Sequence, residues 1–299
     1  METFFLHRER EKSPIKSITM DMARHSLKSK LGGREVILQN GMEAAAQSRA
    51  HLAELIATMV EDGKPLSIFG STQERTIQSG LYRALGDRLT GADIGAIDPH
   101  DIVRWLEAEK HISVTETPLL GFQLGDGEYT KGLEDSYGQK RLMGWYIDIS
   151  DNLALSTRQH PDRVTPLSVQ AENVALFIYC LGKLRAENML TAEECEHSVE
   201  MVTSHQTILE SFLYKAVKAV SGEGVARKLF EEIPPNGFAE NQGITVRFDI
   251  LNEKNELGWQ VRIDFSGKTY TVSAEQMISI MQDGVDLREK LAGGYTTSV

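Results

Sequence analysis

The chain has 299 residues, of which 41% are apolar and 25% charged, and this composition excludes a mostly disordered protein. Its net charge of −11 opposes non-specific binding to phosphate backbones, so any contact with nucleic acid requires a local basic patch. Its 2 cysteines form no CxxC motif, and we find neither a membrane-length apolar run nor a secretory signal, so we expect a cytosolic protein without disulfides.

The N-terminal region, residues 1–110, is predicted to be helical. Residues 1–16 are polar and expected to be loose, and the first 40 residues are basic. We predict a short helix over residues 18–31, ended by Gly32-Gly33, and a long helix over residues 34–62. The broad apolar face of the long helix suits a helical bundle, and it is the basis for predicting a homo-oligomer.

Shorter elements complete this region. Residues 66–69 are predicted to form a strand. Ser71 and Glu74 have the spacing of a capping box and open a predicted helix that runs through residue 89. Asp98-Pro99 is a helix-start signal for residues 101–110.

The middle region, residues 111–235, is predicted to combine antiparallel strands with long helices. Strand character occurs at residues 111–114, 119–124, 142–149 and 153–157, and the polar, glycine-rich segment 125–140 is expected to be a loop or flap. Helices are predicted over residues 168–186, 191–220 and 225–233, before a break at Pro234-Pro-Asn-Gly237.

The C-terminal region, residues 236–299, has the clearest pattern. Apolar residues alternate over 244–250 and 259–265, Ser266-Gly267 is a hairpin signal, and Ser273 with Gln276 forms a capping box before a helix. We predict three antiparallel strands with this helix across their apolar face and with Trp259 buried. Similarity between residues 165–174 and 269–277 leaves open whether segment 111–187 duplicates the unit.

These patterns predict an α+β protein with three domains, 1–110, 111–235 and 236–299. In this arrangement a helical N-terminal region is followed by one or two antiparallel sheet-plus-helix units that are joined by long helices.

One C-terminal stretch, Lys268-Thr-Tyr-Thr-Val-Ser-Ala-Glu-Gln-Met277, joins a strand through a short polar turn to a helix. It resembles the single-stranded-DNA-binding fold of the plant Whirly proteins and related transcriptional coactivators. The resemblance implies binding of a single strand across the exposed sheet face, where Arg247, Arg262 and Lys268 would contact phosphates. The alternative is that the two arginines pair with aspartates across the strands.

Other candidate sites have ordinary structural explanations. Glu194-Cys-Glu-His197, with His205 two turns further along a predicted helix, has the spacing of a metal ligand pair, but an exposed charged helix face is the preferred explanation. His100 fits a helix cap. Phe69-Gly-Ser-Thr72 could cradle a phosphate but lacks the motifs of a nucleotide loop, so Ser71 is interpreted as a cap. We therefore predict no catalytic residue, metal site or cofactor.

Three functions remain open at this stage. The first is a non-enzymatic protein that is regulatory or associated with nucleic acid, with single-stranded DNA as the candidate partner. The second is an acidic protein–protein interaction module, such as an inhibitor, adaptor or effector, without nucleic-acid binding. The third is an enzyme with an unrecognised site beneath the 125–140 loop. None of the three requires a membrane.

Overall fold

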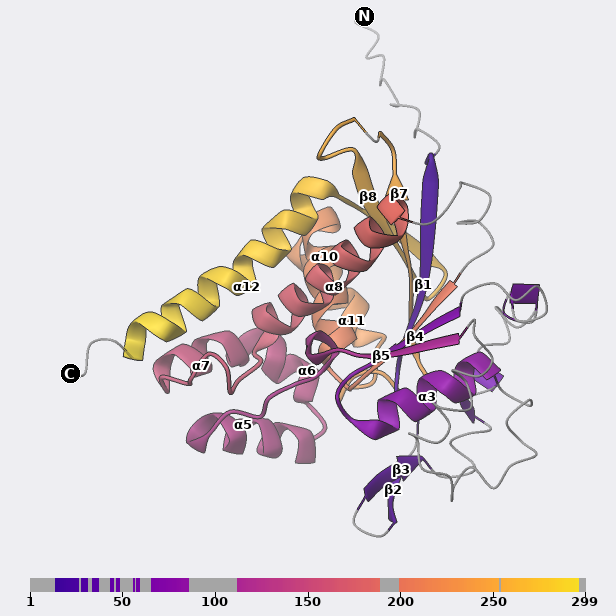
Figure 1. Ribbon diagram of the computed structural model, residues 1–299. Coiled ribbons are helices and arrows are strands. Elements are labelled where there is room, and N and C mark those ends of the chain that lie inside the picture. The colour runs from indigo at the N-terminus through magenta and orange to yellow at the C-terminus, as the bar shows by residue number, and fades with distance from the viewer. Residues whose placement is uncertain are drawn as a thin grey trace, which may run out of the picture.

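The computed structural model describes residues 14–26, 28–31, 34–37, 44–45, 47–48, 56, 58–59, 66–85, 112–188, 199–252 and 254–295. The protein is of the α+β class. Its centre is a seven-stranded mixed sheet with the strand order β5-β4-β6-β1-β7-β8-β9, and β2 and β3 form a separate two-stranded sheet (Figure 1).

The strands of the main sheet come from all three predicted regions. They are β1 (Lys16–Arg24), β4 (Leu66–Gly70), β5 (Ile112–Glu116), β6 (Val199–Ser204), β7 (Gly243–Ile250), β8 (Trp259–Phe265) and β9 (Lys268–Ser273), and the small sheet pairs β2 (Lys28–Leu31) with β3 (Arg34–Ile37). β5, β4, β6 and β1 are parallel, whereas β7, β8 and β9 continue the sheet antiparallel from β1. β1 is therefore the strand at which the two halves of the sheet meet.

Helices cover the sheet on two sides, with α8, α10 and α12 on one face and α3 on the other (Figure 1). The helical elements are α3 (Glu74–Leu85), η3 (Pro118–Leu120), α5 (Gly127–Gly138), α6 (Leu142–Trp145), η4 (Tyr146–Ser150), α7 (Asp151–Ser156), α8 (Leu167–Asn188), α10 (Ile208–Ser221), α11 (Glu223–Glu231) and α12 (Ala274–Tyr295). Within the described part of the chain, no helix has the length and apolar character needed to cross a membrane.

The C-terminal strands and helix confirm the alternation in the sequence. Trp259 is buried, and its ring stacks on Phe248 with a centroid distance of 5.1 Å. The capping box is reciprocal, since the Ser273 amide donates to the Gln276 side chain over 2.9 Å and the Gln276 amide donates to Ser273 Oγ over 3.3 Å. The strands at 66–69 and 111–114 and the helices at 168–186 and 225–233 are also confirmed.

The helical interpretation of the N-terminal region is wrong at two places. Residues 18–31 contain most of β1 and all of β2, and residues 34–37 form β3. Ile18, Met20 and Met22 are fully buried at alternate positions of β1. Methionine is a good helix former, so the residue types in this segment favour a helix although their burial alternates as in a strand.

The middle region differs from its prediction for related reasons. Residues 142–156 are helical, and Trp145 and Tyr146 pack as core aromatics, with Trp145 edge-on to Tyr129 at 5.0 Å. Segment 125–140 is largely helix α5. Residues 199–204 form β6, whose six residues are all buried, so the strand lacks the alternation of a half-exposed strand. Before α8 this region has one strand, β5, and so differs from the three-stranded C-terminal unit among the residues described.

Candidate functional site

The candidate site lies where β1, β4, β5 and β6 end. The carboxyl ends of parallel strands meet at one edge of a sheet, and ligands bind outside that edge in open α/β sheets. β1 is followed directly by His25, β4 by Ser71 and β6 by His205, while β5 ends at Glu116. The register pairs Arg24 with Ser204 and Gly70 with Glu116, so these strand ends are level with one another.

Two buried imidazoles face each other at this edge. His25 is 6% exposed and His205 is 2% exposed. Their ring centroids are 5.4 Å apart and the rings are inclined by 69°. Both histidines follow neighbouring parallel strands, so the sheet itself fixes their separation.

Arg75, in the first turn of α3, bridges the two rings. Its Nε donates to His25 Nε2 over 3.3 Å, and its Nη2 lies 3.3 Å from His205 Nδ1. Because a guanidinium has no acceptor, both of these ring nitrogens present a lone pair.

The remaining ring nitrogens must then carry the protons. His25 Nδ1 lies 2.7 Å from the carbonyl oxygen of Ser26 and can only donate to it. His205 Nε2 donates to Ser71 Oγ over 2.6 Å. Each histidine is thereby held as one neutral tautomer, and in His25 the lone pair is on Nε2, where it accepts the hydrogen bond from Arg75.

Ser71 ties His205 to the start of α3. Its hydroxyl accepts a hydrogen bond from the Gln73 amide over 3.2 Å and also lies 3.2 Å from Thr76 Oγ1. The helix therefore begins at the site, and a helix N-terminus favours a bound anion.

Two cations lie close together at the same edge. Burial lowers the pKa of the Arg75 guanidinium, and the nearby charge of Arg24 lowers it further. Arg24 donates to the Phe238 carbonyl over 2.6 Å and pairs with Glu240 over 3.3 Å, while its buried Nε has no hydrogen-bond partner among the described residues. A multiply charged anion between these guanidinium groups would relieve their mutual repulsion.

The connection from β6 to α10 carries backbone strain. Thr207, two residues after His205, has a φ of 76°, which is unusual for a β-branched residue. Thr207 is 3% exposed and caps α10. Strained residues of this kind cluster at functional sites because the surrounding fold must hold them in place.

Two acidic groups belong to the neighbourhood. Glu116 is exposed at the end of β5, and the next amide, of Thr117, donates to the Gly70 carbonyl over 2.8 Å. Glu210 on α10 is fully buried, and burial raises its pKa to about 6, opposed by hydrogen bonds from the Phe238 and Thr207 amides. Glu116 is therefore accessible at this sheet edge, whereas the Glu210 carboxyl is enclosed and accepts a hydrogen bond from the Phe238 amide.

The three cations predicted to contact nucleic acid lie in the other half of the sheet and are paired with carboxylates. Arg247 pairs with Asp264 and Arg262 pairs with the fully buried Asp249. Lys268 lies 3.6 Å from Glu232. The cross-strand pairing considered as the alternative explanation is therefore present.

The other sequence candidates have mixed outcomes. His100 and Glu194–His197 lie outside the described residues. Ser71 does accept a hydrogen bond from Gln73 in the manner of a cap, but it also contacts His205, so its interpretation as only a cap is incomplete. Among the described residues, no group of three or more His, Cys, Asp or Glu side chains could hold a metal ion.

The residues that form the site were missed by the sequence analysis. Ala23-Arg24-His25-Ser26 and Thr203-Ser204-His205-Gln206 each place a histidine directly after a buried strand. That signal was available only once β1 and β6 were identified as strands. The sequence patterns favour helices for both segments, and a helical assignment places the two histidines at no common sheet edge.

Comparison with known proteins gives structural likeness only. No family model matches the chain, and no curated protein matches it. Solved structures of similar fold include mycobacterial hydrolase 2, with 14% identity over 89% of this chain and 97% of that one and a TM-score of 0.47. A mycobacterial glucosyl-3-phosphoglycerate phosphatase has 14% identity over 83% and 97% of the two chains and a TM-score of 0.43. A candidate alpha-ribazole-5'-P phosphatase from Escherichia coli has 14% identity over 84% and 97% and a TM-score of 0.40.

Identities of 14% and TM-scores below 0.5 carry no residue role over to this chain, so the roles must come from its own geometry. The matches nevertheless correct the first interpretation. They are hydrolases and phosphatases, and no Whirly-like protein appears among them, so the resemblance to that family and the prediction of a non-enzymatic nucleic-acid-binding protein are wrong. The physical reason is that β7, β8 and β9 are not an independent unit, because they extend a sheet whose parallel half ends in the histidine site.

Proposed function

We propose that the protein is a phosphatase that hydrolyses phosphate monoesters through a phosphohistidine intermediate on His25. The observation that supports this most is the convergence of two arginines and two neutral histidines at one sheet edge. Arginine suits phosphate because its planar donors match phosphate oxygens, and a preorganised cluster stabilises charge in the transition state.

His25 is the better nucleophile of the pair. Its lone pair is on Nε2, the distal ring nitrogen, whereas the lone pair of His205 is on Nδ1, which the side chain's own Cβ crowds. When Nε2 bonds to phosphorus the ring becomes positively charged. The Nδ1–H bond to the Ser26 carbonyl then stabilises that charge.

The first chemical step forms one bond and breaks one. His25 Nε2 attacks phosphorus, the bond to the ester oxygen breaks, and the leaving oxygen takes a proton from the carboxyl group of Glu116. Arg24 and Arg75 bind the equatorial phosphate oxygens, so the charge that develops there is neutralised.

The second step restores the enzyme. Glu116, now a carboxylate, accepts a proton from a water molecule while the water oxygen attacks phosphorus and the nitrogen–phosphorus bond breaks. The products are the alcohol and inorganic phosphate. His25 returns to the tautomer it holds in the free protein.

The test is hydrolysis of p-nitrophenyl phosphate together with trapping of the intermediate. Wild type should release p-nitrophenol and carry an acid-labile phosphate on His25 after rapid denaturation and mass spectrometry. His25→Asn should lose both signals. His160→Asn is the matched control, because the His160 side chain is 42% accessible, and it should retain both. Phosphate trapped on His205 instead would show that His205, and not His25, is the nucleophile. If the protein hydrolyses no phosphate monoester at all, the proposed function is wrong.

The role of Glu116 has its own test. Glu116→Gln should slow hydrolysis of an alkyl phosphate far more than that of p-nitrophenyl phosphate, because a phenolate leaves without a proton. An equal decrease in rate on the two substrates would show that Glu116 is not the general acid. Glu240, which pairs with Arg24, would then be the next candidate.

A further inference from the structure

Asn241 connects three parts of the protein around His25. It lies in the turn before β7 with a left-handed backbone, φ 62°, which asparagine tolerates better than most residues. Its amide donates to the Arg24 carbonyl over 3.2 Å, and its carbonyl accepts from Arg83 Nη1 over 3.1 Å. Its side-chain Nδ2 donates to Ser26 Oγ over 3.0 Å. Asn241 therefore forms hydrogen bonds with the residues on both sides of His25, Arg24 and Ser26.

Ser26 connects Asn241 to the His25 ring. It is fully buried, and its amide donates to Ser79 Oγ on α3 over 2.8 Å. Its carbonyl is the acceptor for His25 Nδ1. The position of that carbonyl thus decides both the ring orientation and which ring nitrogen carries the proton.

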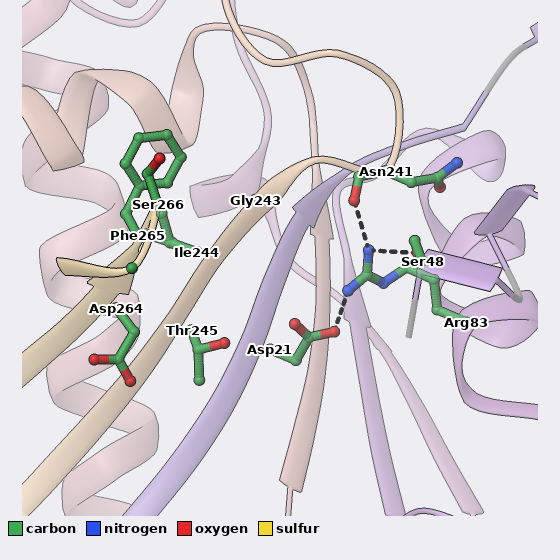
Figure 2. Close-up of a pocket in the computed structure, with 11 residues that line it drawn as sticks. Asp21, Ser48, Arg83, Asn241, Gly243, Ile244, Thr245, Asp264, Phe265 and Ser266 are labelled. Carbon is green, nitrogen blue, oxygen red and sulfur yellow. Dashed lines mark hydrogen bonds and ion pairs between the residues drawn. The ribbon is translucent and has the colours of Figure 1, made fainter. Parts of the chain in front are cut away.

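Asn241 is itself held from behind by a buried ion pair. Figure 2 shows the Asn241 main-chain oxygen and the Asp21 carboxylate both directed at the Arg83 guanidinium. Arg83 is 2% exposed and also donates to Ser48 Oγ over 3.2 Å. Since Asp21 belongs to β1 and Arg83 to α3, the turn at Asn241 is fixed to the two elements that carry Arg24 and Arg75.

We propose that Asn241 is a positioning residue that fixes the Ser26 carbonyl and so holds His25 with Nε2 directed at the phosphorus. This inference rests on the proposed phosphatase function. Loss of the Asn241 side chain should impair attack more than binding, because phosphate binding depends on the guanidinium groups of Arg24 and Arg75. A catalytic group displaced by about 1 Å can slow a reaction up to about a hundredfold.

The experiment compares Asn241→Gly with a matched control. Glycine keeps the left-handed backbone and removes only the side chain. Ser266→Gly is the control, because Ser266 has a φ of 50° in the exposed β8–β9 turn of the same sheet. We expect kcat on p-nitrophenyl phosphate to fall about tenfold to a hundredfold in Asn241→Gly with KM changed less than about twofold. Ser266→Gly should match wild type.

A double-mutant cycle identifies the route of the effect. Ser26→Ala removes the acceptor of the Asn241 side chain, so the double variant should be no slower than the slower single variant. If the fold-decrease in kcat of the double variant equals the product of the two single decreases, Asn241 does not act through Ser26 and the inference is overturned. If Asn241→Gly does not fold, Ser26→Ala alone carries the test, and an unchanged kcat overturns the inference.

A readout independent of activity separates this inference from the proposed function. Ring-nitrogen NMR shifts should show His25 as the single Nδ1–H tautomer in wild type and as a tautomer mixture in Asn241→Gly. A single tautomer in both proteins overturns the positioning role even if the enzyme is active. If wild type hydrolyses no phosphate monoester, the proposed function fails, while the tautomer change still supports Asn241 as the residue that fixes His25.

Discussion

The two halves of the main sheet use positive charge in different ways. In the antiparallel half, Arg247 and Arg262 pair with aspartates on the same sheet face. In the parallel half, Arg75 donates to two neutral imidazoles and lies near another cation, Arg24. The contrast teaches that the arrangement of the cations indicates the ligand site, because a count of basic residues on the sheet face favours the wrong half.

The difference follows from where the cations sit. A side chain in mid-strand has cross-strand neighbours at fixed positions, and natural sheets place opposite charges there. Arg24, the last residue of β1, and Arg75, in the first turn of α3, lie instead at the carboxyl edge of the parallel strands, where ligands bind in such sheets. The predictions below test this contrast, from the largest expected effect to the smallest.

The first prediction concerns the antiparallel half as a purely structural part. Trp259→Ala should lower the free energy of unfolding by about 3–5 kcal/mol through lost burial and a cavity beside Phe248. Urea denaturation measures this loss. The folded fraction should keep its kcat, and a loss below about 1 kcal/mol would mean that the ring is not part of the core.

The second prediction sets one arginine from each half against the other. Arg75→Ala should reduce kcat by about 10²–10³-fold, the effect typical of removing one preorganised donor to the transition state. Arg262→Ala removes an arginine of the same charge and should leave kcat unchanged. Steady-state kinetics on p-nitrophenyl phosphate, at equal concentrations of folded protein, measure the two kcat values. Equal kcat values for the two variants would contradict the proposed difference between the two halves of the sheet.

The third prediction concerns the buried carboxyl group beneath the site. The pKa of Glu210 is raised from 4.5 to about 6, so the folded state binds its proton more tightly than the unfolded state. Its contribution is therefore full below about pH 4.5 and is lost as pH rises through 6, a decrease of about 2 kcal/mol. Glu210→Gln should remove this decrease, and the difference in unfolding free energy between the two proteins should grow from pH 4.5 to pH 7.

Denaturant midpoints at several pH values measure that difference. A stability difference between wild type and Glu210→Gln that stays constant with pH would show that Glu210 titrates alike in both states. A higher free energy of unfolding for Glu210→Gln than for wild type at pH 7 would show that the buried Glu210 carboxylate lowers the stability of the protein.

The fourth prediction has the smallest effect. Arg247→Ala should change the free energy of unfolding by less than about 1 kcal/mol, because both partners of the ion pair are about one-third exposed and solvent screens them. It should also leave kcat unchanged. Thermal unfolding in low and high salt measures the effect, and a large loss that persists in high salt would contradict it.

The contrast also explains which parts of the fold the sequence could predict. Trp259 and Phe265 stand at alternate positions of a sheet face with one polar side, and such a strand shows a period of two. β6 has no exposed side, so its period is invisible, and the methionines of β1 favour a helix in isolation. The two strands that histidines directly follow are therefore the two most difficult to identify.

The site was hidden for a further reason. His25, Arg75 and His205 are distant in the sequence, and they meet only because β1, β4 and β6 are adjacent and parallel. No local spacing encodes that adjacency. Phe69-Gly-Ser-Thr72 indicates a possible phosphate-binding segment, but its link to His205 depends on the strand order. The predicted homo-oligomer and cytosolic location stay predictions.

The central position of β1 has a consequence for how the protein is made. β1 is synthesised before both of its neighbours in the sheet, β6 and β7. Thr19 of β1 pairs with Val199 of β6, and Lys16 pairs with Ile250 of β7. Pairings this distant in sequence are slow to form, and a nascent chain exposes unpaired strand edges while it waits. A ribosome-bound chain that ends before residue 242 lacks the carbonyl that accepts from the Arg24 amide, so we expect no activity until that segment has left the exit tunnel.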